Sequence, residues 1–225
     1  MEETLDRATA EAAVLGGAFL GGGGGGKVAD GLQLAQQALS IGIPRLVSCA
    51  DLSLDDVVVT VSAVGAPAAN ISLLPVHYCR AVTLLQEYSG RKMAGLISSE
   101  NGAIGTVNGW VQSALLQIPV VDAPCDGRAH PTGIMGSMGL HKDPRYVSIQ
   151  SAVGKEGVEL VVRGPLAVTA SLVRQAAVQA GGLVAVARNP VSVRYVQEHA
   201  APGAIQQAIA LGRAMIVARP GGGEA

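Results

Sequence analysis

Aromatic residues and charges are both scarce in this sequence of 225 residues. Aromatics make up 3% and charged residues 15%, and 16 Lys and Arg against 17 Asp and Glu give a formal net charge of −1. This balance excludes a basic nucleic-acid-binding protein and an acidic disordered chain. Apolar residues reach 49% and glycine occupies 30 positions. We therefore expect a globular core of small aliphatic side chains with closely packed backbone.

Cysteines are few, and long apolar runs are missing. Cys49, Cys79 and Cys125 are an odd number at wide spacing without a CxxC pair. This spacing indicates neither a disulfide framework nor a zinc ribbon. The acidic start and the lack of an apolar run of about 18 residues predict a protein with no membrane association. We expect it to be cytoplasmic.

Hydrophobic periodicity predicts alternating helices and strands. Helical spacing covers residues 3–15, 27–39, 75–89, 104–116, 166–180 and 203–214, and β-branched or apolar runs cover 45–48, 56–62, 93–97, 118–121 and 183–187. The alternation predicts an α/β three-layer sandwich around a mostly parallel sheet. The turn residues 154–157 between two apolar runs predict a β-hairpin in the second half.

Two local features predict interruptions of helices, and the chain as a whole predicts one domain. Gly16 and Gly17 should end the first helix, because each glycine costs about 1 kcal/mol relative to alanine in a helix. Pro190 should open a helix near the C-terminus. We expect a single α/β domain over residues 1–217, with lobes at 1–142 and 143–217, and a flexible tail over 218–225.

The run Gly21 to Gly26 is the most conspicuous motif. Its backbone N–H groups, Gly22 to Gly25 above all, could cradle an anion or a substrate at the start of the next helix. A flexible surface loop is an equally good interpretation. The run is not a Walker loop, because Val28 replaces the Ser or Thr that holds magnesium and a helix precedes it. No nucleotide cofactor is expected.

A second candidate site follows the predicted strand at 118–121. Five ionisable side chains occur there within nine positions: Asp122, Cys125, Asp126, Arg128 and His130. Ligands of open α/β sheets collect at the carboxyl ends of strands. Cys125 and His130 could be a nucleophile with its base or two ligands of a soft metal. A turn with a small buried thiol is the favoured alternative for Cys125.

Glu100 stands at the end of another predicted strand, in Ser98-Ser99-Glu100-Asn101-Gly102. Helix capping accounts for Ser99 and Asn101 but less well for Glu100. A carboxylate there could orient a water molecule or the N–H group of a ligand.

These segments, in this order, resemble the S-methyl thiohydantoin desulfurase family. The matching stretches are Gly17 to Gly26, Val64-Gly65-Ala66-Pro67, Glu100-Asn101-Gly102, Ile118 to Asp122, Gly127 to Pro131, Gly182 to Arg188 and Pro202 to Ile205. Their shared order spans about 200 residues, although no single stretch is specific. The sequence departs from the family pattern at His130, where the family favours Phe, and at Thr132, where it favours Glu.

The resemblance implies a three-layer α/β domain that a β-rich domain follows in longer relatives, and hydrolytic removal of sulfur from a thiohydantoin ring. Glu100 and Asp122 would position water and ring N–H groups, Arg128 would hold negative charge, and His130 with Cys125 would supply a base or bind a divalent metal. The alternatives are a non-catalytic subunit and an anion-binding module. We expect a small-molecule substrate and a homo-oligomer, with a companion chain as a source of the β domain and no nucleic-acid partner.

Overall fold

The computed structural model describes residues 3–65 and 71–218. The helices are α1 (Arg7–Leu20), α2 (Val28–Ile41), α3 (Pro75–Ser89), α4 (Trp110–Leu116), α5 (Leu166–Gln179), α6 (Val193–His199) and α7 (Ala204–Val217). The strands are β1 (Glu3–Thr4), β2 (Arg45–Val47), β3 (Val57–Gly65), β4 (Gly95–Ser98), β5 (Val120–Val121), β6 (Ser148–Gly154), β7 (Glu159–Gly164) and β8 (Leu183–Ser192). None of these helices is long and apolar enough to cross a membrane.

All eight strands belong to one sheet with the order β1-β2-β5-β4-β3-β8-β6-β7. The strands β2, β5, β4 and β3 are parallel to their neighbours in that series, and this parallel core confirms the predicted α/β class. The remaining strands pair in antiparallel fashion, and β6 with β7 forms the predicted hairpin. Strands from residues 1–142 and from residues 143–217, the two predicted lobes, belong to this one sheet.

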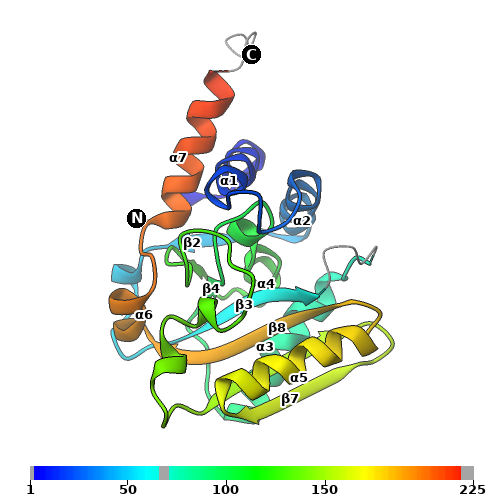
Figure 1. The fold of residues 1–225 in the computed structure, drawn as a ribbon. Helices are drawn as coiled ribbons and strands as arrows, with labels where there is room; N and C mark the ends of the chain where they lie inside the picture. Colours follow the sequence, from blue (N-terminus) through cyan, green and yellow to red (C-terminus); the bar gives the residue numbers. More distant parts are fainter. Residues whose placement is uncertain (1–2, 66–70, 219–225) are drawn as a thin grey trace.

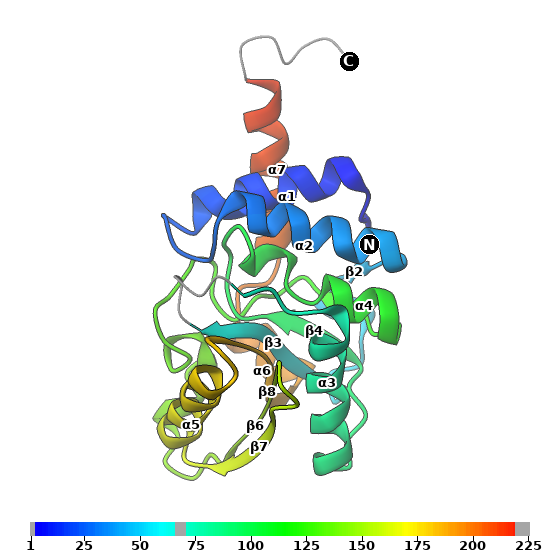
Figure 2. The same ribbon diagram turned by 90° about the vertical axis from the view of Figure 1, so that its right-hand side faces the viewer.

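Helices cover both faces of the sheet. Figure 2 shows α3 and α5 on opposite sides of the antiparallel strands, and α1, α2 and α4 on the side of the parallel strands. Apolar side chains fill the space beneath them, with Val59, Leu96 and Trp110 fully buried. The upper part of α7 projects from the molecule, and the predicted tail lies outside the described residues from 219 onward (Figure 1).

The prediction that Gly16 and Gly17 end the first helix is wrong, because α1 continues to Leu20. The reason is the contact between α1 and α7. A Cβ at Gly16 would overlap the carbonyl oxygen of Ala208, and a Cβ at Gly212 would overlap that of Ala12. The two helices therefore touch backbone to backbone, and the close packing offsets the intrinsic cost of glycine in a helix.

The prediction that Pro190 opens a helix is also wrong. Pro190 lies inside β8, and α6 begins only at Val193. Asn189 and Pro190 together oppose one residue of β3, Val59, so the strand carries a β-bulge there, and Asn189 has a φ of 54°. A bulge leaves one residue out of the hydrogen-bonded ladder, and this accommodates a proline that has no N–H group to donate.

Candidate functional site

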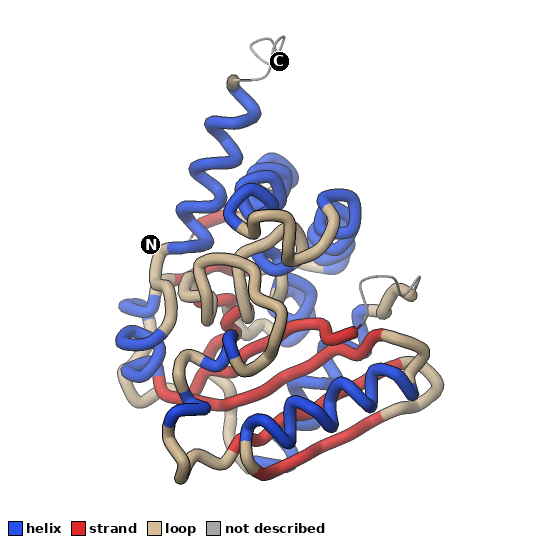
Figure 3. Tube along the Cα trace, viewed as in Figure 1, coloured by secondary structure: helices blue, strands red, loops and turns tan. Residues whose placement is uncertain are grey.

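Three loops from distant parts of the chain meet at the carboxyl ends of β4 and β5. They are the glycine loop (residues 21–27), the segment that follows β4, and the segment 122–130. Figure 3 shows such loops in tan, gathered in front of the sheet between α5 and the pair α1 and α2. A Cβ at Gly25 would lie 2.6 Å from Gly102 Cα, and one at Gly24 would lie 2.8 Å from Ala129 Cβ. Glycine is thus required for this close approach.

Hydrogen bonds hold the three loops together. The carbonyl oxygen of Gly25 accepts the N–H of Ile104 at 2.8 Å, and the N–H of Asn101 donates to the carbonyl oxygen of Asp126 at 3.1 Å. Asn101 is fully buried, and its side-chain amide donates to the carbonyl oxygen of Ala204 at the start of α7. The glycine loop, the Glu100 segment and the 122–130 segment are therefore parts of one rigid arrangement.

Glu100 and His130 form the centre of this arrangement. The backbone N–H of His130 donates to Glu100 Oε2 at 3.0 Å, and His130 Nε2 lies 3.4 Å from the same oxygen. The side chains are 15% exposed for Glu100 and 4% exposed for His130. His130 Nε2 also lies 3.0 Å from the carbonyl oxygen of Ser99. A carbonyl can only accept, so this hydrogen bond requires a proton on Nε2.

The ring of His130 is tightly covered. A Cβ at Gly136 would overlap the ring at Nε2, so the segment that contains Gly136 lies directly on the imidazole. His130 Nδ1 is buried and has no hydrogen-bond partner in the described parts of the chain. Buried polar atoms are nearly always paired, so the unpaired Nδ1 is a candidate for ligand contact.

Asp122 lies in the same region, but its carboxylate serves helix α7. Oδ1 accepts the backbone N–H of Ile205 at 2.8 Å and that of Gln206 at 3.4 Å, and the Asp122 carbonyl oxygen accepts the N–H of Gly203. These are orphan donors of the first turn of α7, where a negative charge also interacts favourably with the helix dipole. The structure thus gives Asp122 a capping contact, and its catalytic role stays a prediction.

Cys125 is a buried thiol. It is 7% exposed, and its Sγ lies 3.2 Å from the hydroxyl oxygen of Thr60 on β3. Burial raises the pKa of Cys125 to about 11, and the hydrogen bond with Thr60 opposes this rise only in part. Little thiolate is present at neutral pH, which disfavours Cys125 as a nucleophile. The thiol forms no hydrogen bond with His130.

Arg128 and the glycine loop lie at the surface of the site. Arg128 is exposed, and its backbone N–H donates to Asp126 Oδ1 at 3.3 Å. In the loop, Gly22, Gly23 and Gly24 are exposed and Gly25 is half-buried. The N–H groups of Gly22 and Gly24 donate to carbonyl oxygens of Phe19 and Gly21, so they already have internal partners. Of the predicted cradle, the N–H groups of Gly23 and Gly25 are the ones without a backbone acceptor among the described residues.

Sequence reasoning missed Arg188 as a site residue. This arginine lies on β8, is 4% exposed, and its Nε is buried without a hydrogen-bond partner in the residues described. Burial lowers the pKa of Arg188, while Cys125 and Glu100 act electrostatically in the opposite direction. Glu100 and Arg188 are therefore near each other without an ion pair. The available signal was an arginine that directly follows the apolar run 183–187.

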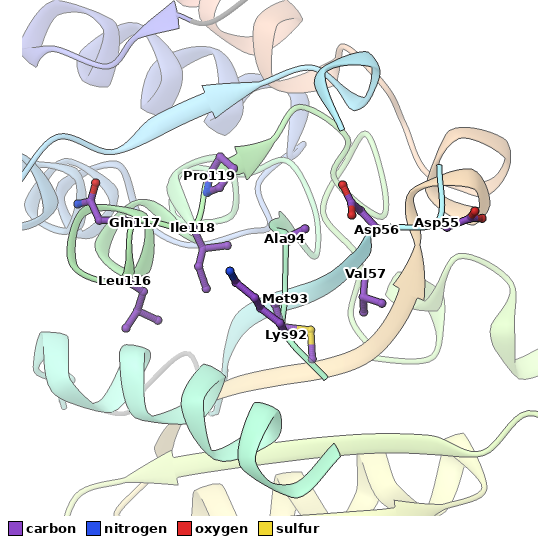
Figure 4. Close-up of a pocket in the computed structure, with 10 residues that line it drawn as sticks. All are labelled: Asp55, Asp56, Val57, Lys92, Met93, Ala94, Leu116, Gln117, Ile118 and Pro119. Carbon is purple, nitrogen blue, oxygen red and sulfur yellow. The ribbon is translucent and has the colours of Figure 1, made fainter. Parts of the chain in front are cut away.

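Two hollows lie away from this site. The larger, about 560 Å³, is at the amino ends of β3, β4 and β5, and Figure 4 shows its lining side chains, with Lys92 and Asp56 among them. The carboxylate of Asp56 accepts the N–H of Ser53 at 2.9 Å. The smaller, about 320 Å³, lies beside Tyr146 and Arg163. We favour the Glu100 site because ligands of such sheets bind at the carboxyl ends of the strands.

Within the described residues, three or more His, Cys, Asp or Glu side chains nowhere come together in a way that could hold a metal ion. The predicted soft-metal pair of Cys125 and His130 therefore has no third ligand of these types among them.

Comparison with known proteins identifies a family and a solved structure that are similar to this chain. The model of the family described as S-Me-THD-like, N-terminal domain matches residues 9–162. A crystal structure of a protein from Chromobacterium violaceum, a structural genomics target, has a TM-score of 0.81 and 28% sequence identity over 96% of this chain. The match covers 61% of that protein, so this chain spans about three fifths of its length. No curated protein matches.

Proposed function

Because this chain belongs to the S-Me-THD-like N-terminal domain family, we propose that it is an enzyme that hydrolyses a small cyclic imide-like or thiohydantoin-like ring. The reacting atom would be the ring carbon that carries sulfur. The observation that carries this proposal is the Glu100 carboxylate, which the backbone N–H of His130 holds beside the glycine loop at the carboxyl ends of the parallel strands.

Glu100 is the general base of the proposed reaction. Its Oε2 is anchored by the N–H of His130, and this leaves Oε1 to take the proton of an attacking water molecule. The water oxygen forms a bond to the ring carbon, and negative charge develops on the ring atom next to it. The C–S bond then breaks, and the sulfur of an S-methyl thiohydantoin leaves as methanethiol with the proton that Glu100 returns. The remaining hydroxyl proton moves to the ring nitrogen, so the ring carbon becomes a carbonyl. Atoms and charge balance without an oxidant.

The glycine loop would stabilise the developing charge. The N–H groups of Gly23 and Gly25 are the donors for this role, because those of Gly22 and Gly24 already donate within the loop. Donors that are fixed before the reaction lower the barrier more than donors that must reorient. Asp122 would support this arrangement by holding α7 against the segment 122–130.

The test is sulfur release by the purified full chain from 2-thiohydantoin and S-methyl thiohydantoin derivatives, followed by thiol titration and by NMR of the ring product. We expect Glu100→Gln to lower kcat by about 100-fold or more, because general-base catalysis typically contributes 10²–10⁴-fold. Glu198→Gln is the matched control, since Glu198 and His199 form an exposed pair at 3.9 Å.

Full activity of Glu100→Gln would contradict the assignment of the base. Binding of the ring without any turnover would instead favour the alternative, a non-catalytic subunit or small-ligand module. The expected homo-oligomer and the companion chain with a β-rich domain stay predictions, which size-exclusion chromatography of the chain alone and of a co-expressed pair would test.

A further inference from the structure

Arg188 is a buried cation without a counterion. It lies in the middle of β8, is 4% exposed, and its guanidinium forms neither an ion pair nor a side-chain hydrogen bond with the parts of the chain that are described. Charged side chains are almost never buried unpaired, because desolvation without a partner costs several kcal/mol. A bound ligand is therefore a source of the partner that Arg188 lacks among the described residues.

The sheet register surrounds Arg188 with polar groups. Thr60 on β3 and Gln150 on β6 are its register partners on the two neighbouring strands, so all three lie on the same face of the sheet. Gln150 donates through Nε2 to Ser148 and Thr169, and its Oε1 is buried without a partner among the described residues. A free donor and a free acceptor thus occupy adjacent strands.

The guanidinium is connected to the Glu100–His130 pair by one covering segment, residues 131–137. A Cβ at Gly133 would lie 2.7 Å from Arg188 Nη1, and a Cβ at Gly136 would overlap the ring of His130. The segment therefore lies on both groups with glycine at each contact. Pro131, Thr132 and Met135 within it are exposed, so the segment that covers the two groups also faces solvent.

We propose that Arg188 is the receptor for a carboxylate group of the ligand, in a subsite beside the Glu100–His130 pair and beneath residues 131–137. This rests on the proposed function, which it extends: the ring would carry an anionic side chain. The planar fork of an arginine fits a carboxylate with two parallel hydrogen bonds, and the buried position makes each of them strong. Gln150 Oε1 is placed to accept an N–H group of the same ligand.

The experiment compares hydantoin-5-acetic acid with hydantoin-5-acetamide, which has nearly the same shape but no charge. Binding to the full chain is measured by calorimetry, with hydantoin and sodium acetate as ring-only and carboxylate-only probes. We expect the acid to bind about tenfold or more tightly than the amide, as hydrogen bonds to charged groups allow. In Arg188→Gln the ratio should fall to about one, with the amide affinity little changed.

Arg174→Gln is the matched control, because Arg174 is an exposed arginine on α5, the helix that covers the same face of the sheet. Circular dichroism of each variant establishes that it folds, and Arg188→Lys, which keeps the charge without the fork, should retain part of the preference.

The outcomes separate the two proposals. The carboxylate subsite is wrong if the acid and the amide bind with equal affinity, or if Arg188→Gln still binds the acid more tightly than the amide. Binding of hydantoin in either case means that the ring site stands. If acetate binds in an Arg188-dependent way and hydantoin does not, the subsite stands and the proposed ring chemistry fails. If none of the four probes binds, both proposals are overturned.

Discussion

One carboxylate oxygen, Glu100 Oε2, contacts both the backbone and the ring of His130. The backbone N–H lies 3.0 Å from this oxygen and the ring Nε2 lies 3.4 Å from it, across 30 positions of the sequence. The two contacts have separate consequences. The backbone contact fixes the carboxylate whatever side chain stands at 130, whereas only an imidazole can share a proton with it.

His130→Phe separates these two contacts. The backbone hydrogen bond to Glu100 is retained, and phenylalanine fills a similar volume, so the melting temperature should change by only a few degrees. Glu100 keeps its anchoring hydrogen bond, and the family favours Phe at this position, so the rate of sulfur release should fall by far less than the roughly 10²-fold contribution of a general base. A loss of that size would show that the imidazole itself takes part in the reaction.

Cys125 should be unreactive in the native protein. With a pKa of about 11, roughly one thiol in a thousand is ionised at pH 8, and burial also keeps reagents away. Because the pKa is raised, the thiolate and its alkylation should increase only as the pH approaches 11. Mass spectrometry after iodoacetamide treatment measures this, with urea-unfolded protein as the reference. Rapid labelling of the native protein at pH 8, or loss of activity in Cys125→Ala, would support the role of Cys125 as a nucleophile.

Asp122→Ala should destabilise the protein by about 1–2 kcal/mol, because two backbone donors of α7 lose their acceptor. Asp122→Asn keeps an acceptor oxygen and should cost less. Urea unfolding gives the free energies, and Asp6→Ala, which removes the carboxylate that accepts the Thr9 N–H at the start of α1, is the matched control. If Asp122→Ala is as stable as the parent protein but inactive, Asp122 has a catalytic role instead.

Gly16→Ala tests the backbone contact between α1 and α7 by the sign of its effect. In a solvent-exposed helix, the change from glycine to alanine stabilises by about 1 kcal/mol. Here the added methyl group meets the carbonyl of Ala208, which belongs to a helix backbone and cannot turn aside. We expect a loss of about 1–3 kcal/mol, as for other overpacked sites. A raised melting temperature would show that the helices separate easily.

The elements of this fold were predictable where short-range pattern decides them. The helix at 75–89 was predicted with its observed bounds, and the hairpin turn at 154–157 was recognised from its residues. Gly16 and Pro190 were misjudged because their surroundings are set by α7 and β3, which are far away in the sequence. Propensity is a weak prior where tertiary packing competes with it.

The candidate site was predictable only in part for the same reason. Glu100 and His130 were chosen for their chemistry at strand ends, and the parallel strands bring those ends together. Asp122 was chosen on the same ground, but its carboxylate faces the first turn of α7, a partner 83 residues away. In the sequence, Arg188 is marked only as a charged residue that follows an apolar run. The sheet register is needed to show that it lies next to Thr60 and Gln150.

Arg188→Met should make the protein more stable while it abolishes the preference for a carboxylate. Methionine has a similar length and no charge to desolvate, and replacing buried ionic groups with apolar ones is often neutral or stabilising by 1–4 kcal/mol. For a protein of this size, each kcal/mol raises the melting temperature by about 2–4 °C. Hydantoin-5-acetic acid should raise the melting temperature of the parent protein and not that of the variant, because only binding to the folded state stabilises it. A destabilised variant would mean that Arg188 has a partner within the fold, and the carboxylate subsite would lose its basis.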